Sequence, residues 1–320
     1  MTRRSLISSV PAMAAAAAAD SAKRLPVKKG VLVSMLPKEL SMKDKFQLAK
    51  DSGFDAVEGQ TVEDPAIETE MAKASQATGV PIHSVMNMLH WQFPLSSSDN
   101  EAVTKSMGGM ETSIRNAAAW GANTVLLVPG VVNPATGYAD AYKRSQAQIR
   151  KLIPSAEKNK VVIAVENVWN KFLLSPLEAA AYVDAFKSPM VRWHFDVGNV
   201  VDSGWPDQWI RVLGPRIAKI HVKEYSRKLR DEKGPRTGFQ VNLMEGDSDW
   251  PNVMAALDAV GYRGWMIKEY FLNYDAMNND FTVRLGDMPS VKYHDSHGEQ
   301  DYLVTLAETG LSTNTGGRLK

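Results

Sequence analysis

VVIAVE, at residues 161–166, is the first of four apolar runs in the second half of this chain that each end on a carboxylate or an imidazole. The other three runs are VRWHFD at 191–196, RIAKIH at 216–221 and GWMIKE at 264–269. Each has the length of a parallel strand that is buried on both faces, and each is followed by a loop and a helical stretch. Since the strands of a parallel barrel end on one common face, we expect the four terminal side chains to converge there.

The same alternation of apolar run and helical pattern extends back toward the N-terminus. The earlier strand candidates are GVLVSM from Gly30, FDAVEG from Phe54, VPIHSVM from Val80 and TVLLVPG from Thr124, which makes eight in all. Several of the intervening amphipathic stretches close on a glycine, as helices often do, at Gly53, Gly79 and Gly261. Eight βα units predict a single-domain TIM (β/α)8 barrel. The competing fold, an open doubly wound sheet, lacks its glycine-rich fingerprint after the first strand.

The amino-acid composition limits the kinds of partner and metal site that the chain can have. Hydrophobic residues make up 44% and charged residues 23%, which is ordinary for a globular protein, and the net charge of +1 does not favour a nucleic-acid partner. The absence of cysteine excludes disulfides, thiolate zinc sites and iron–sulfur clusters. Three carboxylates and one imidazole, from Glu166, Asp196, His221 and Glu269, instead suit one divalent ion such as Mn²⁺, Mg²⁺, Co²⁺ or Zn²⁺. The plain alternative is carboxylates that face solvent or cap helices, and a hydrogen-bonded core histidine.

The N-terminal residues 1–19 have the pattern of an export signal. They combine a positive start, a short apolar stretch and an alanine run, and TRRSLI at residues 2–7 resembles a twin-arginine signal. We therefore expect a periplasmic or secreted protein, with a linker at 20–29 and the barrel over 30–320. A disordered alanine-rich tail on a cytoplasmic protein is the alternative. The stretch is too short and too rich in alanine for a membrane span, so no stable membrane insertion is expected.

Four segments resemble a known family. They are ENVWNKFLLSP at 166–176, HFDVGN at 194–199, HVKEY at 221–225 and GDSDWP at 246–251. These resemble the xylose-isomerase-like sugar phosphate isomerase and epimerase superfamily, and within it the ketose 3-epimerases and pentulose-5-phosphate 3-epimerases. The resemblance implies that Glu166, Asp196, His221 and Glu269 bind one divalent metal. It also implies that Glu166 and Glu269 carry the proton transfers.

The chemistry of that family accounts for these residue types. A proton beside a ketone is removed only if the developing enediolate is stabilised, and a metal ion supplies that stabilisation. Two carboxylates can then remove the proton from one face and return it to the other, or return it to the adjacent carbon. Epimerisation, isomerisation and elimination all start in this way. A sugar dehydratase, a keto-glycoside lyase, a non-catalytic sugar-binding barrel and an endonuclease therefore stay as alternatives, the last disfavoured by only six histidines.

Further polar and aromatic residues near the strand ends are candidates for binding a small sugar. Lys223 and Arg227 follow His221, where Arg227 could bind a hydroxyl or a phosphate oxygen, and the plain alternative is a solvated basic run. Glu58 ends the second strand and could contact substrate or form an ordinary salt bridge. The remaining candidates, which could equally serve loop packing, are Asn87, His90, Trp91, Trp169 and Asn199. Asn199 stands where some family members have a substrate-binding histidine, so the resemblance does not define a narrow substrate.

The C-terminal region departs from the family pattern. Residues 271–298 form a polar insertion before an expected last helix at EQDYLVTLAETG. Within the insertion, His294, Asp295 and His297 could form a second metal site or an exposed loop. A homo-oligomer is also compatible with the sequence.

Overall fold

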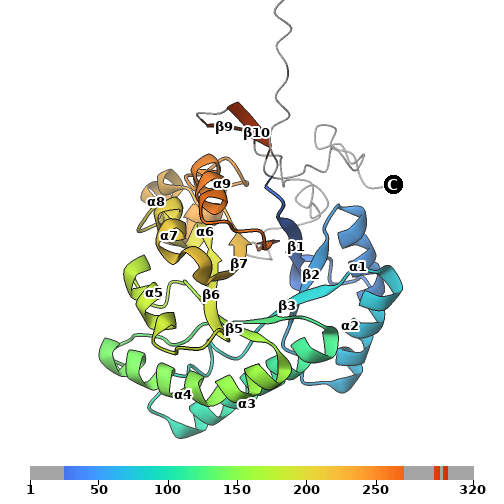
Figure 1. The fold of residues 1–320 in the computed structure, drawn as a ribbon, viewed down its shortest axis with the longest axis vertical. Coiled ribbons are helices and arrows are strands. Elements are labelled where there is room, and N and C mark those ends of the chain that lie inside the picture. The colour runs from blue at the N-terminus through green and yellow to red at the C-terminus, as the bar shows by residue number, and fades with distance from the viewer. Residues whose placement is uncertain (1–24, 270–291, 296–297, 302–320) are drawn as a thin grey trace, which may run out of the picture.

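The computed structural model describes residues 25–269, 292–295 and 298–301, and a closed barrel of eight parallel strands lies at its centre (Figure 1). The strands follow one another in chain order, and the last pairs with the first. Their bounds are β1 Lys28–Leu32, β2 Ala56–Gln60, β3 Ile82–Met86, β4 Thr124–Leu127, β5 Val162–Glu166, β6 Val191–Asp196, β7 Ile217–Val222 and β8 Trp265–Lys268. The predicted TIM barrel is confirmed. Each strand overlaps the run expected for it, although β1 begins two residues before Gly30 and β2 extends one residue past Gly59.

Helices surround the barrel between successive strands (Figure 1). They are α1 Met42–Asp51, α2 Pro65–Thr78, α3 Asn100–Trp120, α4 Tyr138–Asn159, α5 Pro176–Asp184, α6 Val197–Val201, α7 Pro206–Leu213, α8 Arg227–Lys233 and α9 Trp250–Ala259. Three short 3-10 turns, η1 Val33–Met35, η2 Gly214–Arg216 and η3 Pro235–Phe239, complete the described connections. Gly79 caps α2 with a φ of 72°, a left-handed conformation that glycine adopts without steric cost.

Alternation along the strands separates the helix-facing core from the barrel interior. Phe195 of β6 faces the helices, where its ring lies 6.4 Å from that of Trp209 in α7. Its neighbours His194 and Asp196 point the other way, since successive side chains of a strand face opposite sides. His221 of β7 contacts Glu58 of β2, and β8 and β1 lie between those strands, so this contact crosses the interior. The interior is therefore polar near the strand ends.

Two short strands lie beyond the barrel. β9 Lys292–Asp295 and β10 Gly298–Asp301 form an antiparallel pair. The helix expected from Glu299 thus begins in the structure as a strand, because Glu299 pairs with His294 across the hairpin. Of the candidate second metal site, His294 and Asp295 belong to β9, while His297 lies outside the described residues.

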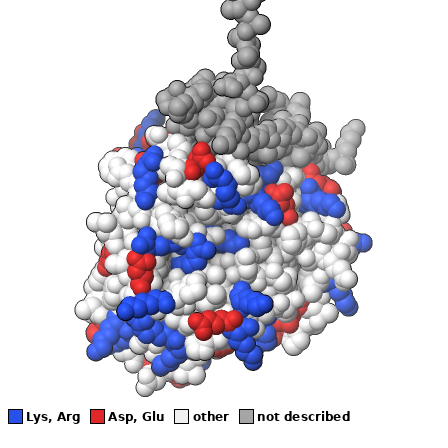
Figure 2. Space-filling view, in the orientation of Figure 1, with Lys and Arg blue, Asp and Glu red and all other residues white. Residues whose placement is uncertain are grey.

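The expected export signal, residues 1–19, and most of the linker also lie outside the described part of the chain. Within the described part, none of the helices has the length and hydropathy of a membrane span. On the face drawn in Figure 2, acidic and basic side chains are interspersed, in line with the net charge of +1.

Candidate active site

The last four barrel strands bring the four candidate ligands together. Glu166 and Asp196 are the last residues of β5 and β6, and Glu269 directly follows β8. His221 is the next-to-last residue of β7. One ligand atom from each of the four side chains lies within 4.8 Å of the others. The barrel thus places them at the face where catalytic groups of this fold collect.

His221 and Lys223 are the cationic partners of the three carboxylates. Nδ1 of His221 is 2.9 Å from Oε1 of Glu166 and 2.7 Å from Oε2 of Glu269. Nζ of Lys223 is 2.8 Å from Oδ2 of Asp196 and 3.0 Å from Oε2 of Glu269. All five residues are buried. The predicted substrate residue Lys223 therefore reaches into the same cluster as the candidate ligands.

Burial and charge separate the two glutamates electrostatically. Burial raises the pKa of Glu166 to about 7, and the neighbouring Glu269 and Asp196 charges add to the effect against that of His221. Burial alone would also raise the pKa of Glu269, but the charges of Lys223 and His221 outweigh it and hold that pKa well below its usual range. In the metal-free site Glu166 is therefore protonated more readily than Glu269.

The end of β6 is held by its neighbours so that one oxygen of Asp196 faces the cluster. Oδ1 of Asp196 accepts the backbone N–H of Asn199, at 2.7 Å, in the first turn of α6. The side chain of Asn167 accepts the Asp196 N–H at 3.0 Å and donates to the Asp196 carbonyl at 2.7 Å. Oδ2 of Asp196 is left to face Lys223. Asn167, which directly follows Glu166 in the sequence, thus holds the backbone of Asp196 on both sides.

Trp169 and Asn199 form part of the wall beside Asp196. Nε1 of Trp169 donates to the Asn199 carbonyl at 3.0 Å, and the Asn199 side chain donates to the Asn167 carbonyl at 3.0 Å. The Trp169 ring packs against that of Phe239, with 5.0 Å between centroids. The Trp169 side chain remains partly exposed, so its ring offers an apolar surface near the carboxyl ends of the strands.

Asn87, His90 and Trp91 follow β3 and differ in what they have left to offer. Oδ1 of Asn87 accepts the N–H groups of Leu89 and His90, at 2.8 and 3.1 Å, which shapes the turn. Nδ1 of His90 accepts the N–H of Val128 at 3.3 Å, and burial lowers the pKa of His90 to about 3. Asn87 and His90 thus have structural partners, whereas the Trp91 ring contacts that of His90 edge to face, with 5.8 Å between centroids, and stays half exposed.

Arg227 begins α8 and contacts the loop before α7. Its guanidinium donates to the Gly204 carbonyl at 2.9 Å and lies 5.5 Å from the centroid of the Trp205 ring. Its backbone N–H donates to Oδ2 of Asp247 at 2.6 Å. One nitrogen of the guanidinium therefore donates to the protein backbone, and the other N–H groups of Arg227 can donate to a ligand.

Glu224, which sequence reasoning did not single out, is the anchor of the loop after β7. Its Oε1 accepts the N–H groups of Tyr225 and Ser248, at 3.1 and 3.0 Å. Its Oε2 accepts the Met244 N–H and the Trp250 indole N–H, both at 2.9 Å. A buried carboxylate with four N–H donors is well satisfied, so Glu224 has a structural role beside the site.

Glu58 lies inside the barrel, beneath the cluster. It is fully buried, with Oε2 at 2.8 Å from Nε2 of His221 and Oε1 accepting the hydroxyl of Ser84 at 2.7 Å. Of the two roles expected for Glu58, contact with substrate or an ordinary salt bridge, the contact with His221 matches the salt bridge. Both carboxylate oxygens are committed to protein groups.

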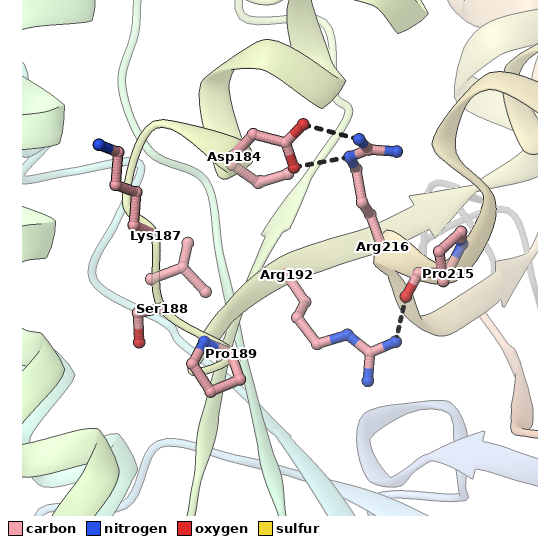
Figure 3. Close-up of a pocket in the computed structure, with 9 residues that line it drawn as sticks. Asp184, Lys187, Ser188, Pro189, Arg192, Pro215 and Arg216 are labelled. Atoms are coloured by element: carbon pink, nitrogen blue, oxygen red, sulfur yellow. Dashed lines mark hydrogen bonds and ion pairs between the residues drawn. The ribbon is translucent and has the colours of Figure 1, made fainter.

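A separate hollow of about 440 Å³ lies at the opposite end of the strands. Figure 3 shows it beside Arg192 near the start of β6 and Pro215 just before β7. Arg216 makes a two-point ion pair with Asp184, at 2.8 and 2.6 Å, and Arg192 donates to backbone carbonyls. Because its two arginines have protein partners and it lies away from the carboxyl ends of the strands, it is not the candidate active site.

The donor set fits a divalent ion. Mn²⁺, Mg²⁺, Co²⁺ and Zn²⁺ all accept oxygen and imidazole ligands, and three carboxylates can neutralise a dication even with Lys223 close by. The ligand atoms are close enough to share one ion. Fold and cluster together define a TIM-barrel protein with an acidic, imidazole-containing centre at the carboxyl ends of its strands.

Comparison with known proteins identifies the family. Residues 46–282 match the xylose isomerase-like TIM barrel family, and the chain belongs to it. UlaE of Escherichia coli O1:K1, an L-ribulose-5-phosphate 3-epimerase, is 25% identical over 255 residues, which are 76% of this chain and 86% of UlaE.

Two solved structures show the same fold. The D-allulose 3-epimerase of a Methylomonas species has a TM-score of 0.62 and 18% identity, covering 78% of this chain and 86% of its own. The 3-keto-D-glucoside 4-epimerase YcjR of E. coli has a TM-score of 0.65 and 15% identity, covering 81% of this chain and 98% of its own.

Proposed function

We propose that this protein is a divalent-metal-dependent carbohydrate epimerase or isomerase that acts through an enediolate. The observation that carries the proposal is the meeting of Glu166 and Glu269 at one point. They come from β5 and β8, which are not neighbours in the barrel, yet both lie within 3 Å of Nδ1 of His221. Two carboxylates on different sides of one site allow one to take a proton and the other to return it. The epimerases among the relatives support this assignment.

Glu166, Asp196, His221 and Glu269 would hold the ion. When bound, the metal would stabilise the negative charge that develops on the ketose oxygen. The protein groups account for the rest. Asp196 is fixed through Oδ1 by α6 and turns Oδ2 to the site, and His221 presents Nδ1. Glu166 and Glu269 would also carry the proton transfers, one accepting a proton and the other returning it.

The substrate we propose is a ketose or a keto-sugar derivative without a phosphate. The twin-arginine-like residues 1–19 support export of the mature protein, and phosphorylated sugars are mainly cytoplasmic metabolites. The exposed rings of Trp91 and Trp169 could cover the apolar face of a sugar, and Arg227 could contact a hydroxyl. UlaE is named for a phosphorylated ketose, so the phosphate is the point to test. Export itself is tested by cell fractionation of the parent and of an Arg3→Lys, Arg4→Lys variant.

Proton exchange tests the proposed reaction directly. Metal-loaded protein is incubated in deuterated water with free ketoses, keto-glycosides and their phosphates, and deuterium beside the carbonyl is measured by NMR. We expect deuterium incorporation, with an epimer or aldose as product. Loss of water or of an aglycone would instead identify a dehydratase or a lyase on the same site. No exchange with any compound, together with no metal uptake, would leave a sugar-binding barrel.

Glu166→Gln and Glu269→Gln provide the matched variants. Each removes a proton-transfer group, which is worth roughly 10²- to 10⁴-fold in rate, and a charged ligand. We expect a parent-like circular dichroism spectrum and no measurable turnover. Full activity in either variant would sink the two-carboxylate mechanism.

A further inference from the structure

The contact between Glu58 and His221 indicates a role for Glu58, which is not one of the four candidate metal ligands. Glu58 is 0% exposed, and its carboxylate reaches from β2 across the barrel to Nε2 of His221 at 2.8 Å. The other ring nitrogen, Nδ1, faces Glu166 and Glu269 at 2.9 and 2.7 Å. The imidazole thus has one nitrogen in the candidate metal site and the other against a carboxylate that is not part of it.

A neutral imidazole has one N–H and one lone pair, and the partner at one nitrogen decides which nitrogen keeps the proton. A metal ion needs the lone pair. A carboxylate without a proton only accepts, so the contact at Nε2 requires the N–H to be there. We propose that Glu58 is a positioning residue that holds His221 in the Nε2–H tautomer, with Nδ1 directed at the metal. This inference rests on the proposed function, because it assumes that His221 is a metal ligand.

The surroundings of Glu58 keep it in place for this role. Its second oxygen accepts the Ser84 hydroxyl at 2.7 Å, so the carboxylate is held from both ends. Ser84 belongs to β3, which pairs directly with β2 at this point, Glu58 opposite Ser84. The ring of His194 lies 4.1 Å from that of His221 and limits its rotation. Glu58 therefore has a fixed distance and direction to the imidazole.

The dissociation constant for a metal ion measures how much Glu58 contributes to the binding by His221. Loss of such an outer partner typically weakens metal binding by about 10- to 100-fold. Glu58→Leu removes the acceptor, and we expect the Mn²⁺ dissociation constant to rise by roughly that factor. Glu58→Gln keeps a neutral acceptor oxygen and should lose less. Ser84→Ala removes only one of the two contacts that hold the Glu58 carboxylate, so its effect on the dissociation constant should be smaller than that of Glu58→Leu.

The titration is followed by the electron paramagnetic resonance signal of free Mn²⁺, with circular dichroism to confirm the fold. A second measurement requires no substitution. In ¹⁵N-histidine protein loaded with Zn²⁺, long-range ¹H–¹⁵N spectra should show His221 protonated at Nε2, and the His221→Asn variant assigns the signal. A parent that binds metal while both Glu58 variants fold and keep its affinity would overturn the inference alone. Protonation at Nδ1 in the loaded parent would do the same.

A parent that takes up no divalent ion would be a different outcome. It would overturn the proposed function, and this inference with it. The titration of the parent therefore separates the two cases before any variant is compared.

Discussion

Lys223→Met should make the metal-free protein less stable and its metal binding tighter. The Lys223 ammonium lies 2.8 Å from Asp196 and 3.0 Å from Glu269, and its side chain is 1% exposed. In the absence of an ion it is a main counter-charge for these buried carboxylates. Breaking a buried ion pair by removing one partner costs about 3–5 kcal/mol, because the other charge stays buried without compensation. We expect a loss of this size in the free energy of unfolding.

A metal ion should reverse the sign of the effect. The ion and the ammonium approach the same oxygens of Asp196 and Glu269, and like charges a few ångströms apart repel. Without Lys223, the cluster keeps three carboxylates and loses a competing cation. We therefore expect the variant to bind Mn²⁺ more tightly than the parent and to regain most of its stability when loaded.

Urea unfolding with and without Mn²⁺, followed by tryptophan fluorescence, measures both changes. Lys228→Met is the control, because Lys228 is 81% exposed and its contact to Glu232 is 4.0 Å, so little change is expected. If Lys223→Met is as stable as the parent without metal, the counter-charge argument is wrong. Metal binding that is unchanged or weaker would refute the competition between lysine and ion.

Three further predictions concern other residues near the site. His221→Ala and Asp196→Ala remove proposed ligands that transfer no proton, so excess Mn²⁺ or Co²⁺ should restore part of the activity of these two variants. The same excess should not restore activity to Glu166→Gln or Glu269→Gln. Equal rescue of all four variants in metal titrations would mean that the two glutamates act only as ligands. Arg227→Ala should raise KM only modestly for an unphosphorylated substrate, whereas a loss of about a hundredfold confined to phosphates would show a phosphate anchor, since such contacts contribute about 1.5–3 kcal/mol. Burial lowers the pKa of His90 in the folded protein to about 3, whereas a histidine in the unfolded chain has a pKa of about 6.5. Below pH 6.5 the unfolded chain therefore binds a proton at His90 that the folded protein does not bind, and the free energy of unfolding falls as the pH drops. Between pH 6.5 and 5.5 the parent should lose about 1 kcal/mol more than His90→Gln in urea unfolding, and equal slopes would contradict a neutral His90.

The fold and the positions of the candidate ligands could be predicted from sequence for a simple physical reason. A strand buried on both faces reads as an apolar run of fixed length, and parallel strands joined by helices must all end on the same side. The runs that close on Glu166, Asp196 and Glu269 therefore indicated one cluster before any distance was known. Left-handed glycines such as Gly79 marked helix ends in the same local way.

Contacts across the barrel were decided only by the tertiary structure. Glu58 and His221 are 163 residues apart, on strands that do not pair, so no local pattern relates them. Sequence placed Lys223 near the mouth, but only the direction of its side chain shows that its ammonium meets Asp196 and Glu269. The difference in pKa between Glu166 and Glu269 depends on burial and on charges brought from other strands. Such long-range electrostatic terms exist only once the barrel has closed, because only closure brings those groups together and removes water from between them.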